Sequence, residues 1–333
     1  LGAANAGRVP GLLGRWASPR SLLFLAMGAQ VGLCLLPVWL RSEMLLWAVC
    51  IGVQAITSVM WPIVQSYLVA GRHGPAMRSV IGMFNLTWMT AVALPLFPMA
   101  PLIEHHARMV FLGLAAANVL GLLPILWFAA KPREHEAHLA AAHVPPGYRQ
   151  LLKSARVLLP LSYILNAALS PVLPYRFEAI GTEIVRQTPI TALWMIARVV
   201  AMVVMWRLAF WHGRWGALLL AGLTMSGGFG LVLLAPSLPL LMLGLAVFGV
   251  GMGTVYYAAL YYGMAVGHAE VEAGGAHEAL IGLGYTIGPA AGLLGAWLGG
   301  GPAIVAIVWT LIGGGSVGAL VPYLRARKLR QAD

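Results

Sequence analysis

Arg198 is the residue whose type and position most clearly indicate chemistry. It lies in the middle of the apolar segment 189–211, with Trp194 one helical turn earlier. A charge at the centre of a bilayer-spanning helix costs about 2.5 to 3.5 kcal/mol on insertion scales, and it usually marks an ion or substrate pathway. We therefore expect Arg198 to bind an anionic solute group or to pair with a carboxylate, with Trp194 stacked on the guanidinium. A static structural pair is the alternative.

Polar side chains also recur at helical spacing in three other apolar segments. Because residues three or four apart share one face of a helix, each set should form a polar stripe. A polar group inside hydrocarbon needs a partner or a water-filled cavity, so we expect these stripes to face inward and line a solute cavity. Alternatively, the amides join helices and the tyrosines anchor the chain at the membrane surface. The residues are Gln54, Thr57, Trp61 and Gln65, then Tyr163 and Asn166, and then Thr254, Tyr257 and Tyr261.

A glycine and proline motif near the end of the chain predicts a site of bending. It consists of Gly284, Gly288, Pro289 and Gly292 in one apolar segment. Small residues let two helices approach closely, and proline removes a backbone hydrogen bond and permits a kink. The motif indicates a conformational hinge, with ordinary helix packing as the alternative.

The elements that position these residues are apolar segments long enough to cross a bilayer. The chain has 333 residues, of which 60% are hydrophobic and only 9% charged, whereas a soluble domain carries about 25% charged residues. Segments of about 20 apolar residues indicate spanning helices. We predict an all-α polytopic membrane protein with ten visible helices, at 21–40, 44–70, 80–103, 108–130, 156–175, 189–211, 216–235, 239–266, 279–299 and 303–324.

The acidic residues exclude several enzyme classes. The ten acids are nine Glu and the single Asp333, so an Asp-rich metal or phosphotransfer motif cannot form, and no HExxH, GxSxG or Walker motif is present. We expect no enzyme, no cofactor and no metal site. The stretch from His268 to Glu278 is expected to be a solvated loop, so that all ten acids lie outside the membrane core.

The basic residues indicate the orientation of the chain. The net charge of +11 comes from residues between the apolar segments, and they gather on one side of the predicted membrane. That side holds both chain ends and the polar link 131–155, and the positive-inside rule makes it cytoplasmic. This pattern excludes a nucleic-acid partner, because no basic polar face exists. Only four bases fall on the other side: Arg41, Arg108, Arg176 and Arg186.

The two halves of the chain repeat one another. Gly14 and Arg15, followed by Trp, recur as Gly213 and Arg214, at an offset of 199 residues (213 minus 14), and Arg8 aligns with Arg207. Such self-similarity indicates two copies of one unit. The same offset places the first helix and most of the second before Leu1, so we expect a truncated arrangement of six plus six helices. The expected parts are 1–130, the cytoplasmic link 131–155, and 156–333.

Two six-helix halves, a polar central loop and a Gly/Arg loop resemble the major facilitator superfamily. The family's loop usually reads G-x-L-x-D-R-x-G-R-R. Here Gly7, Gly14 and Arg15 fit, whereas Gly11 and Leu12 occupy the Asp and Arg positions. The resemblance implies that Gly7, Arg8, Gly14, Arg15, Gly213 and Arg214 belong to loops that control the conformational change.

The resemblance also implies a function. It predicts a bacterial inner-membrane secondary transporter that works by alternating access, as a monomer in the lipid bilayer with a cytoplasmic C-terminus. Proton-linked export of a small organic compound is the leading expectation, with protons as the coupling ion. Uptake of a metabolite, including an anionic one, is the first alternative. A non-transporting assembly or sensor protein is the second, and the departure at Gly11 and Leu12 supports it.

Overall fold

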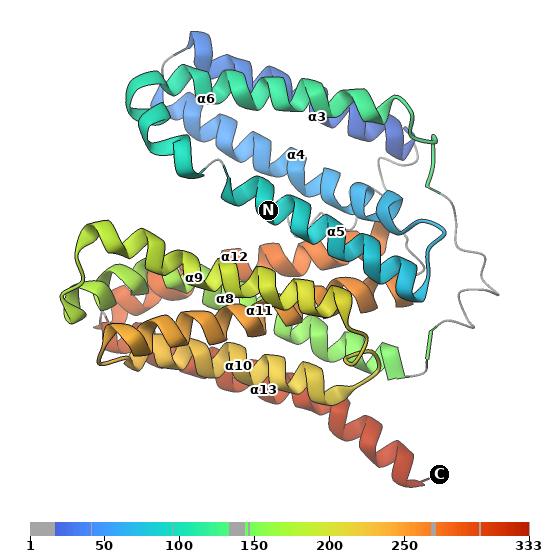
Figure 1. Ribbon diagram of the computed structural model, residues 1–333, viewed down its shortest axis with the longest axis vertical. Helices are drawn as coiled ribbons and strands as arrows, with labels where there is room; N and C mark the ends of the chain where they lie inside the picture. Colours follow the sequence, from blue (N-terminus) through green and yellow to red (C-terminus); the bar gives the residue numbers. More distant parts are fainter. Residues whose placement is uncertain are drawn as a thin grey trace. The chain divides into compact units, whose positions relative to one another are not determined.

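The chain is almost entirely α-helical in a computed structural model, which describes residues 17–40, 42–94, 96–132, 144–145, 147–267, 271–299 and 301–332 (Figure 1). These ranges contain no strand. Their ten helices are α3 (Pro19–Trp39), α4 (Glu43–Val69), α5 (Gly74–Ala93), α6 (Leu96–Ile125), α8 (Gly147–Ile180), α9 (Ile184–Arg207), α10 (Trp215–Leu234), α11 (Leu238–Val266), α12 (Val271–Gly299) and α13 (Gly301–Ala332).

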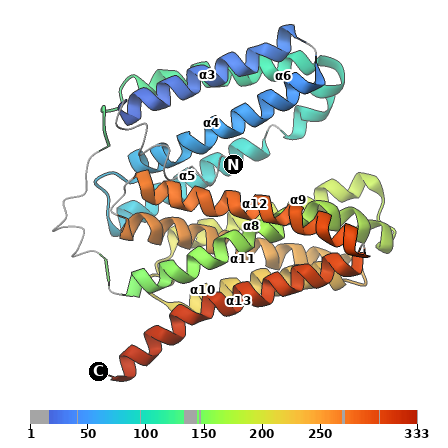
Figure 2. The ribbon, with the colours of Figure 1, turned by 180° about the vertical axis from the view of Figure 1, so that it is seen from behind.

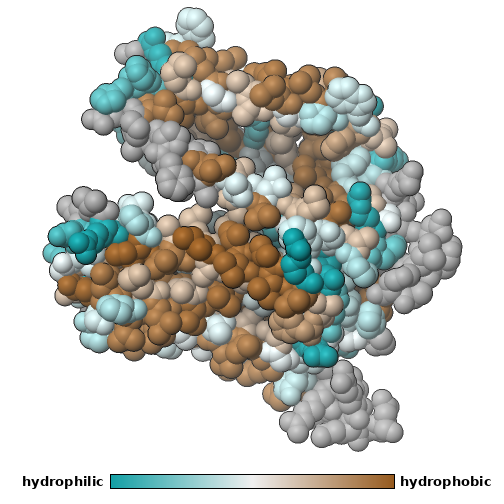
Figure 3. All heavy atoms as spheres, viewed as in Figure 1, coloured by the Kyte–Doolittle hydropathy of each residue, from teal (hydrophilic) through white to brown (hydrophobic). Residues whose placement is uncertain are grey.

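The helices have the length and the surface of membrane spans. Nine of those described are long and apolar enough to cross a bilayer. On the face drawn in Figure 3, hydrophobic atoms cover the middle of the helices and hydrophilic atoms gather toward their ends. Exposed tryptophans such as Trp39, Trp127 and Trp297 would be unfavourable in water. The prediction of an all-α, multi-pass membrane protein is confirmed.

The first of two compact units comprises residues 1–72, 87–137 and 267–279. In it α3 packs along both α4 and α6 (Figure 2). Leu23, Ile63 and Ile125 form its buried apolar cluster. Gln30 of α3 and Thr57 of α4 are joined by a side-chain hydrogen bond of 2.7 Å, and such bonds hold helices together where lipid gives no hydrophobic driving force.

The second unit comprises residues 73–86, 138–266 and 280–333. Its central helix is α11, which packs against α8, α9 and α10, while α13 packs against α8. Glycines make these contacts close. A Cβ added at Gly228 of α10 would lie 2.8 Å from the Cα of Phe248 in α11, so only a glycine allows the two backbones to approach this far.

Several helix boundaries differ from the prediction by apolar length. Helix α8 begins at Gly147 rather than 156, and α12 begins at Val271 rather than 279, because a helix continues through polar residues that a hydropathy window rejects. The predicted segment 80–103 is divided: α5 ends at Ala93, and α6 continues to a break in helical geometry at His106 (φ −141°, ψ 46°).

The observed start of α12 overturns the expectation that Glu278 lies in a loop. Hydropathy predicts Glu278 in a solvated loop outside the membrane core. The residue lies instead two turns inside α12, a helix with the length and hydropathy of a membrane span. The polar residues Glu272, His277 and Glu278 lower the local hydropathy enough to resemble a loop.

Candidate solute site

Arg198 is positioned by a close contact between α9 and α11. Gly249 and Gly253 of α11 lie one turn apart and face the α9 backbone. A Cβ at Gly249 would overlap the carbonyl oxygen of Trp194, and one at Gly253 would lie 2.6 Å from the carbonyl oxygen of Arg198. The two glycines therefore let α9 lie directly on α11, which places the Arg198 side chain inside the second unit.

The guanidinium of Arg198 is surrounded by tyrosines. Only 3% of the residue is exposed. Its Nη2 donates a hydrogen bond of 3.0 Å to the hydroxyl of Tyr163 in α8, and its Cζ lies 5.0 Å from the ring centroid of Tyr256 and 5.7 Å from that of Tyr163. Aromatic faces attract a cation within about 6 Å, so both rings stabilise the guanidinium in this position.

Helix α12 completes this group of side chains. The ring of Tyr285 lies 5.0 Å from that of Tyr163, in edge-to-face geometry, and the Nδ2 of Asn166 donates to the Tyr285 hydroxyl at 3.4 Å. We call Asn166, Tyr163, Arg198, Tyr256 and Tyr285 the arginine–tyrosine cluster. It unites α8, α9, α11 and α12 in one unit.

The predicted hinge motif holds α12 against α8 beside the cluster. A Cβ at Gly284 would lie 2.6 Å from the carbonyl oxygen of Pro160, and one at Gly288 would lie 2.6 Å from the Cβ of Ala167. The motif therefore serves close helix packing here. Pro289 lies within the same continuous helix, and so does Gly292. A hinge role for the motif stays a prediction.

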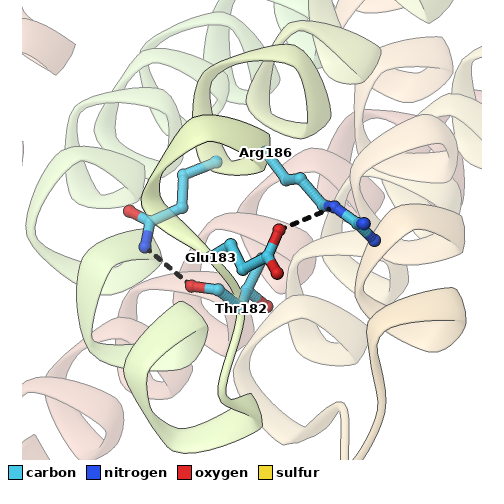
Figure 4. A network of polar contacts seen from close by, with 4 residues as sticks. Thr182, Glu183 and Arg186 are labelled. Atoms are coloured by element: carbon cyan, nitrogen blue, oxygen red, sulfur yellow. Dashed lines mark hydrogen bonds and ion pairs between the residues drawn. The ribbon is translucent and has the colours of Figure 1, made fainter.

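An ion pair marks the start of α9, away from its buried arginine. Glu183 forms an ion pair of 3.1 Å with Arg186, and Gln187 donates to the carbonyl of Thr182 at 3.2 Å (Figure 4). Both charged side chains of that pair are exposed. Arg186 is thus a solvent-facing arginine on the same helix as Arg198, which makes it a matched control for variants of the buried one.

Trp194 packs differently from the expectation. Its ring lies 6.3 Å from that of Phe248 in α11, while Tyr163 and Tyr256 place their rings over the Arg198 guanidinium. The i, i+4 spacing correctly puts Trp194 on the same stretch of α9 surface. It could not reveal that other helices supply rings to the arginine.

The predicted polar stripe of α4 lies in the first unit. Gln54 is exposed, and the Thr57 hydroxyl donates to the carbonyl of Val53 at 2.7 Å. The ring of Trp61 lies 6.4 Å from that of Trp88. Gln65 is 1% exposed and donates to the carboxylate of Glu278 at 2.6 Å. A cavity role for these four residues stays a prediction.

The predicted α11 stripe lies partly in a second aromatic group. Tyr257 and Tyr261 are buried beside Trp211, with ring centroids 5.8 and 5.1 Å from the indole. The Tyr257 hydroxyl donates to the carbonyl of Arg78 at 2.6 Å. Thr254, one turn from Tyr257, donates to the carbonyl of Val250 in its own helix at 2.9 Å. A role of the three in solute binding remains a prediction.

The link between α9 and α10 is fixed by this aromatic group. Gly213 has φ 67°, which a residue with a Cβ rarely adopts, and Arg214 follows as the N-cap of α10. The Gly213 N–H donates to the Tyr262 hydroxyl at 3.1 Å. The corresponding loop residues of the first half, Gly7, Arg8, Gly14 and Arg15, lie outside the described residues.

His212, in the same link, should make stability depend on pH. Burial, together with the positive charge of Arg78, lowers the pKa of His212 from 6.5 to about 4, and its ring stacks on Tyr261 at 4.7 Å. Between these values the unfolded chain binds more protons than the folded chain, so the folded state loses stability as pH falls from 6.5 to 4. We expect the melting temperature in detergent to fall over that window, and to fall less in His212→Phe. Equal falls in the two proteins would contradict this assignment.

Tyr256 and Tyr285 are adjacent in the sequence to the predicted residues Tyr257 and Gly284, but spacing within one helix does not show that they belong to the arginine–tyrosine cluster. Glu278 is not predicted as a functional residue. Glu278 falls within the expected loop. A helical pattern continued upstream of 279 could have found it, since Ala273, His277 and Leu280 to Ile281 follow a helical period.

Comparisons with known proteins identify the fold. No protein-family model matches the chain, and no curated protein sequence matches it. Among solved structures, the human organic anion transporter MFSD10 (TETRAN) is similar with a TM-score of 0.74 and 17% identity, over 97% of this chain and 80% of that one. The major facilitator superfamily transporter FucP in the outward conformation gives 0.67 and 11%, over 95% and 86%. A variant of the E. coli fucose:proton symporter FucP gives 0.65 and 12%, over 95% and 87%.

The chain therefore has the major facilitator fold, as the sequence resemblance predicted. The identities are too low to transfer a substrate from these structures. What the site can do chemically follows from its own residues. A guanidinium offers a planar set of N–H donors that matches a carboxylate, and tyrosine rings beside it would pack on an apolar body attached to that carboxylate.

Proposed function

We propose that the chain is a secondary transporter that moves a small organic anion across the membrane by alternating access, with Arg198 binding the anionic group. One observation supports this most strongly. Arg198 is buried in a spanning helix, where its guanidinium contacts the hydroxyl of Tyr163 and the ring faces of Tyr163 and Tyr256.

The energetics favour a functional role for this arginine. A buried charge is costly, and a simple packing role would be filled at lower cost by an apolar side chain of similar volume. An anionic solute that arrives at the guanidinium would form a charge-assisted, two-bond contact with it. An organic anion is also the solute class named for the structurally similar human transporter MFSD10.

The sequence supports the orientation and the energy source. Transport is proton-linked, and export is its leading direction, with uptake of an anionic metabolite as the alternative. The chain is a monomer in a bacterial inner membrane. Its C-terminus lies in the cytoplasm, because the positive-inside rule places the side with most basic residues there. The similarity to a fucose:proton symporter supports proton coupling.

Benzoate and benzamide test the solute class directly. The two molecules share a ring and nearly the same shape, but only benzoate carries a charge near neutral pH. We expect the purified chain to bind benzoate at least about tenfold more tightly than benzamide, and to carry labelled benzoate into proteoliposomes, because only the anion pairs with Arg198. Equal binding of the two, or entry no faster than into liposomes without protein, would contradict the proposal.

A further inference from the structure

Glu278 and Gln65 meet within the first unit, although 213 positions separate them in the sequence. Gln65 lies in α4 and Glu278 in the first turns of α12. From Val271 to Glu278 the helix rises by about 10 Å, so the carboxylate is well inside a segment with the properties of a membrane span. Neither residue belongs to the arginine–tyrosine cluster.

The contact between the two side chains is short. The Nε2 of Gln65 donates to the Oε1 of Glu278 at 2.6 Å. Gln65 is 1% exposed, whereas Glu278 is partly exposed. One oxygen of the carboxylate is thus fixed by a buried amide.

The carbonyl oxygen of the Gln65 side chain accepts no hydrogen bond from a described residue. This atom, Oε1, is buried. A buried acceptor left without a donor costs about 1 to 3 kcal/mol. A protonated Glu278 would supply that donor, since its O–H could bond to the Gln65 Oε1 while the Gln65 N–H bonds to the Glu278 carbonyl oxygen. An amide and a carboxylic acid form such a two-bond pair, whereas an amide and a carboxylate can form only one of the bonds.

Other charged and titratable groups lie on or near the helices that carry Gln65 and Glu278. Its own helix adds Glu272, which is exposed, and His277, which is buried. In α4 the Tyr67 hydroxyl donates to the carbonyl of Ala129 at 2.7 Å, and Arg72, just beyond that helix, donates to the carbonyl of Leu68 at 2.6 Å. At the start of α3, Arg20 is close enough to influence Tyr67.

The carboxylate of Glu278 accepts a hydrogen bond from the uncharged amide of Gln65. An ionised carboxylate in a spanning helix is costly. Protonation removes that cost and completes the hydrogen bonds of Gln65.

We propose that Glu278 is a proton-binding site of this transporter and that Gln65 is its positioning residue. Glu278 takes one proton from water to form an O–H bond and later returns it to water. Gln65 donates to the carboxylate in one state and accepts from the acid in the other. The coupling part of this proposal rests on the proposed transport function, whereas proton binding by itself does not.

Infrared spectroscopy tests proton binding without any solute. The purified chain, reconstituted in lipid, is titrated with acid while the carboxylic C=O stretching band is followed in H₂O and in D₂O. We expect one D₂O-sensitive band that Glu278→Gln abolishes and that the matched variant Glu272→Gln, on the same helix, retains. A Glu278→Gln spectrum that has lost no band of the unmodified chain would overturn the proposal.

The positioning role of Gln65 has its own signature. A hydrogen bond to a carboxylic C=O lowers its stretching frequency, so Gln65→Leu should raise the frequency of the Glu278 band without abolishing it. An unchanged frequency would show that Gln65 does not contact the protonated acid. A simple loss of stability in Gln65→Leu would not move the band of the protein that remains folded.

A transport measurement then separates the coupling step from transport itself. With benzoate as the probe, we expect an imposed pH gradient to drive faster accumulation in proteoliposomes with the unmodified chain than in liposomes without protein, which report the passive entry of benzoic acid. In Glu278→Gln we expect at least about a tenfold loss of gradient-driven accumulation, while exchange of labelled for unlabelled benzoate continues. If both proteins transport benzoate at a rate that does not depend on the pH gradient, the coupling role is overturned and the transport function stays intact. An absence of any benzoate movement, with the infrared band present, would overturn the transport function and leave the proton site intact.

Discussion

Replacing Arg198 with alanine is expected to lower the affinity for benzoate at least about 30-fold and to abolish benzoate transport in proteoliposomes. A hydrogen bond to a charged group contributes about 1.5 to 3 kcal/mol, and a factor of ten corresponds to about 1.4 kcal/mol. Binding can be measured by calorimetry in detergent, and transport by uptake of labelled benzoate.

Two further variants isolate the geometry of the guanidinium. Arg198→Lys keeps the charge but loses the planar fork that contacts both carboxylate oxygens, so we expect a loss of affinity that is smaller, about tenfold. Arg186→Ala removes an exposed arginine from the same helix and only a surface ion pair with Glu183, which contributes little; benzoate binding should stay unchanged. Normal transport by Arg198→Ala would overturn the anion-binding role.

The proposed function assigns different chemistry to the two compact units. The second unit holds a fixed positive charge at Arg198, supported by Tyr163 and Tyr256. The first unit holds a carboxylate at Glu278 whose charge can be removed by one proton, supported by Gln65. An anion binds to the fixed charge, and a coupling proton needs a group that changes charge. The two requirements call for different residue types, and the chain supplies one of each inside spanning helices.

Much of the fold could be predicted from sequence because membrane spans have a strong signal. About 20 apolar residues in succession are required to cross the bilayer, and on that basis hydropathy places α10 and α11 within a few residues of their observed bounds. The signal fails where a helix carries polar residues. Val271 to Glu278 reads as a loop by hydropathy, although helix formation depends on backbone hydrogen bonds that Glu and His do not disturb.

The candidate site could be predicted only in part, since its contacts join distant helices. Arg198 is identifiable alone, because any charge in an apolar segment is costly. The proximity of Tyr256 and Tyr285 to Arg198 is not, because it depends on how closely α11 and α12 pack. That packing is encoded by glycines such as Gly253 and Gly284, and a sequence shows glycines without showing which helix they face.

Replacing Gly253 with leucine is expected to lower the melting temperature of the second unit and to abolish benzoate binding together with it. The Cβ alone would lie 2.6 Å from the carbonyl oxygen of Arg198 and 3.1 Å from the Cβ of Ala201. Both neighbours belong to α9, and the backbone oxygen cannot move unless the helix shifts. Overpacking of this kind costs about 1 to 3 kcal/mol, and a shifted α9 would carry Arg198 away from Tyr163.

Gly227→Leu is the matched control, because it adds the same side chain at a helical glycine of the same unit. No heavy atom lies within 4 Å of a Cβ built at Gly227 in α10, so the leucine meets open space and should leave both melting temperature and benzoate affinity unchanged. Circular dichroism during heating in detergent measures the first, and calorimetry the second. Equal behaviour of the two variants would contradict the close contact between α9 and α11. A Gly253→Leu protein that melts early but still binds benzoate normally would separate the site from that contact, and would argue against Arg198 being positioned by it.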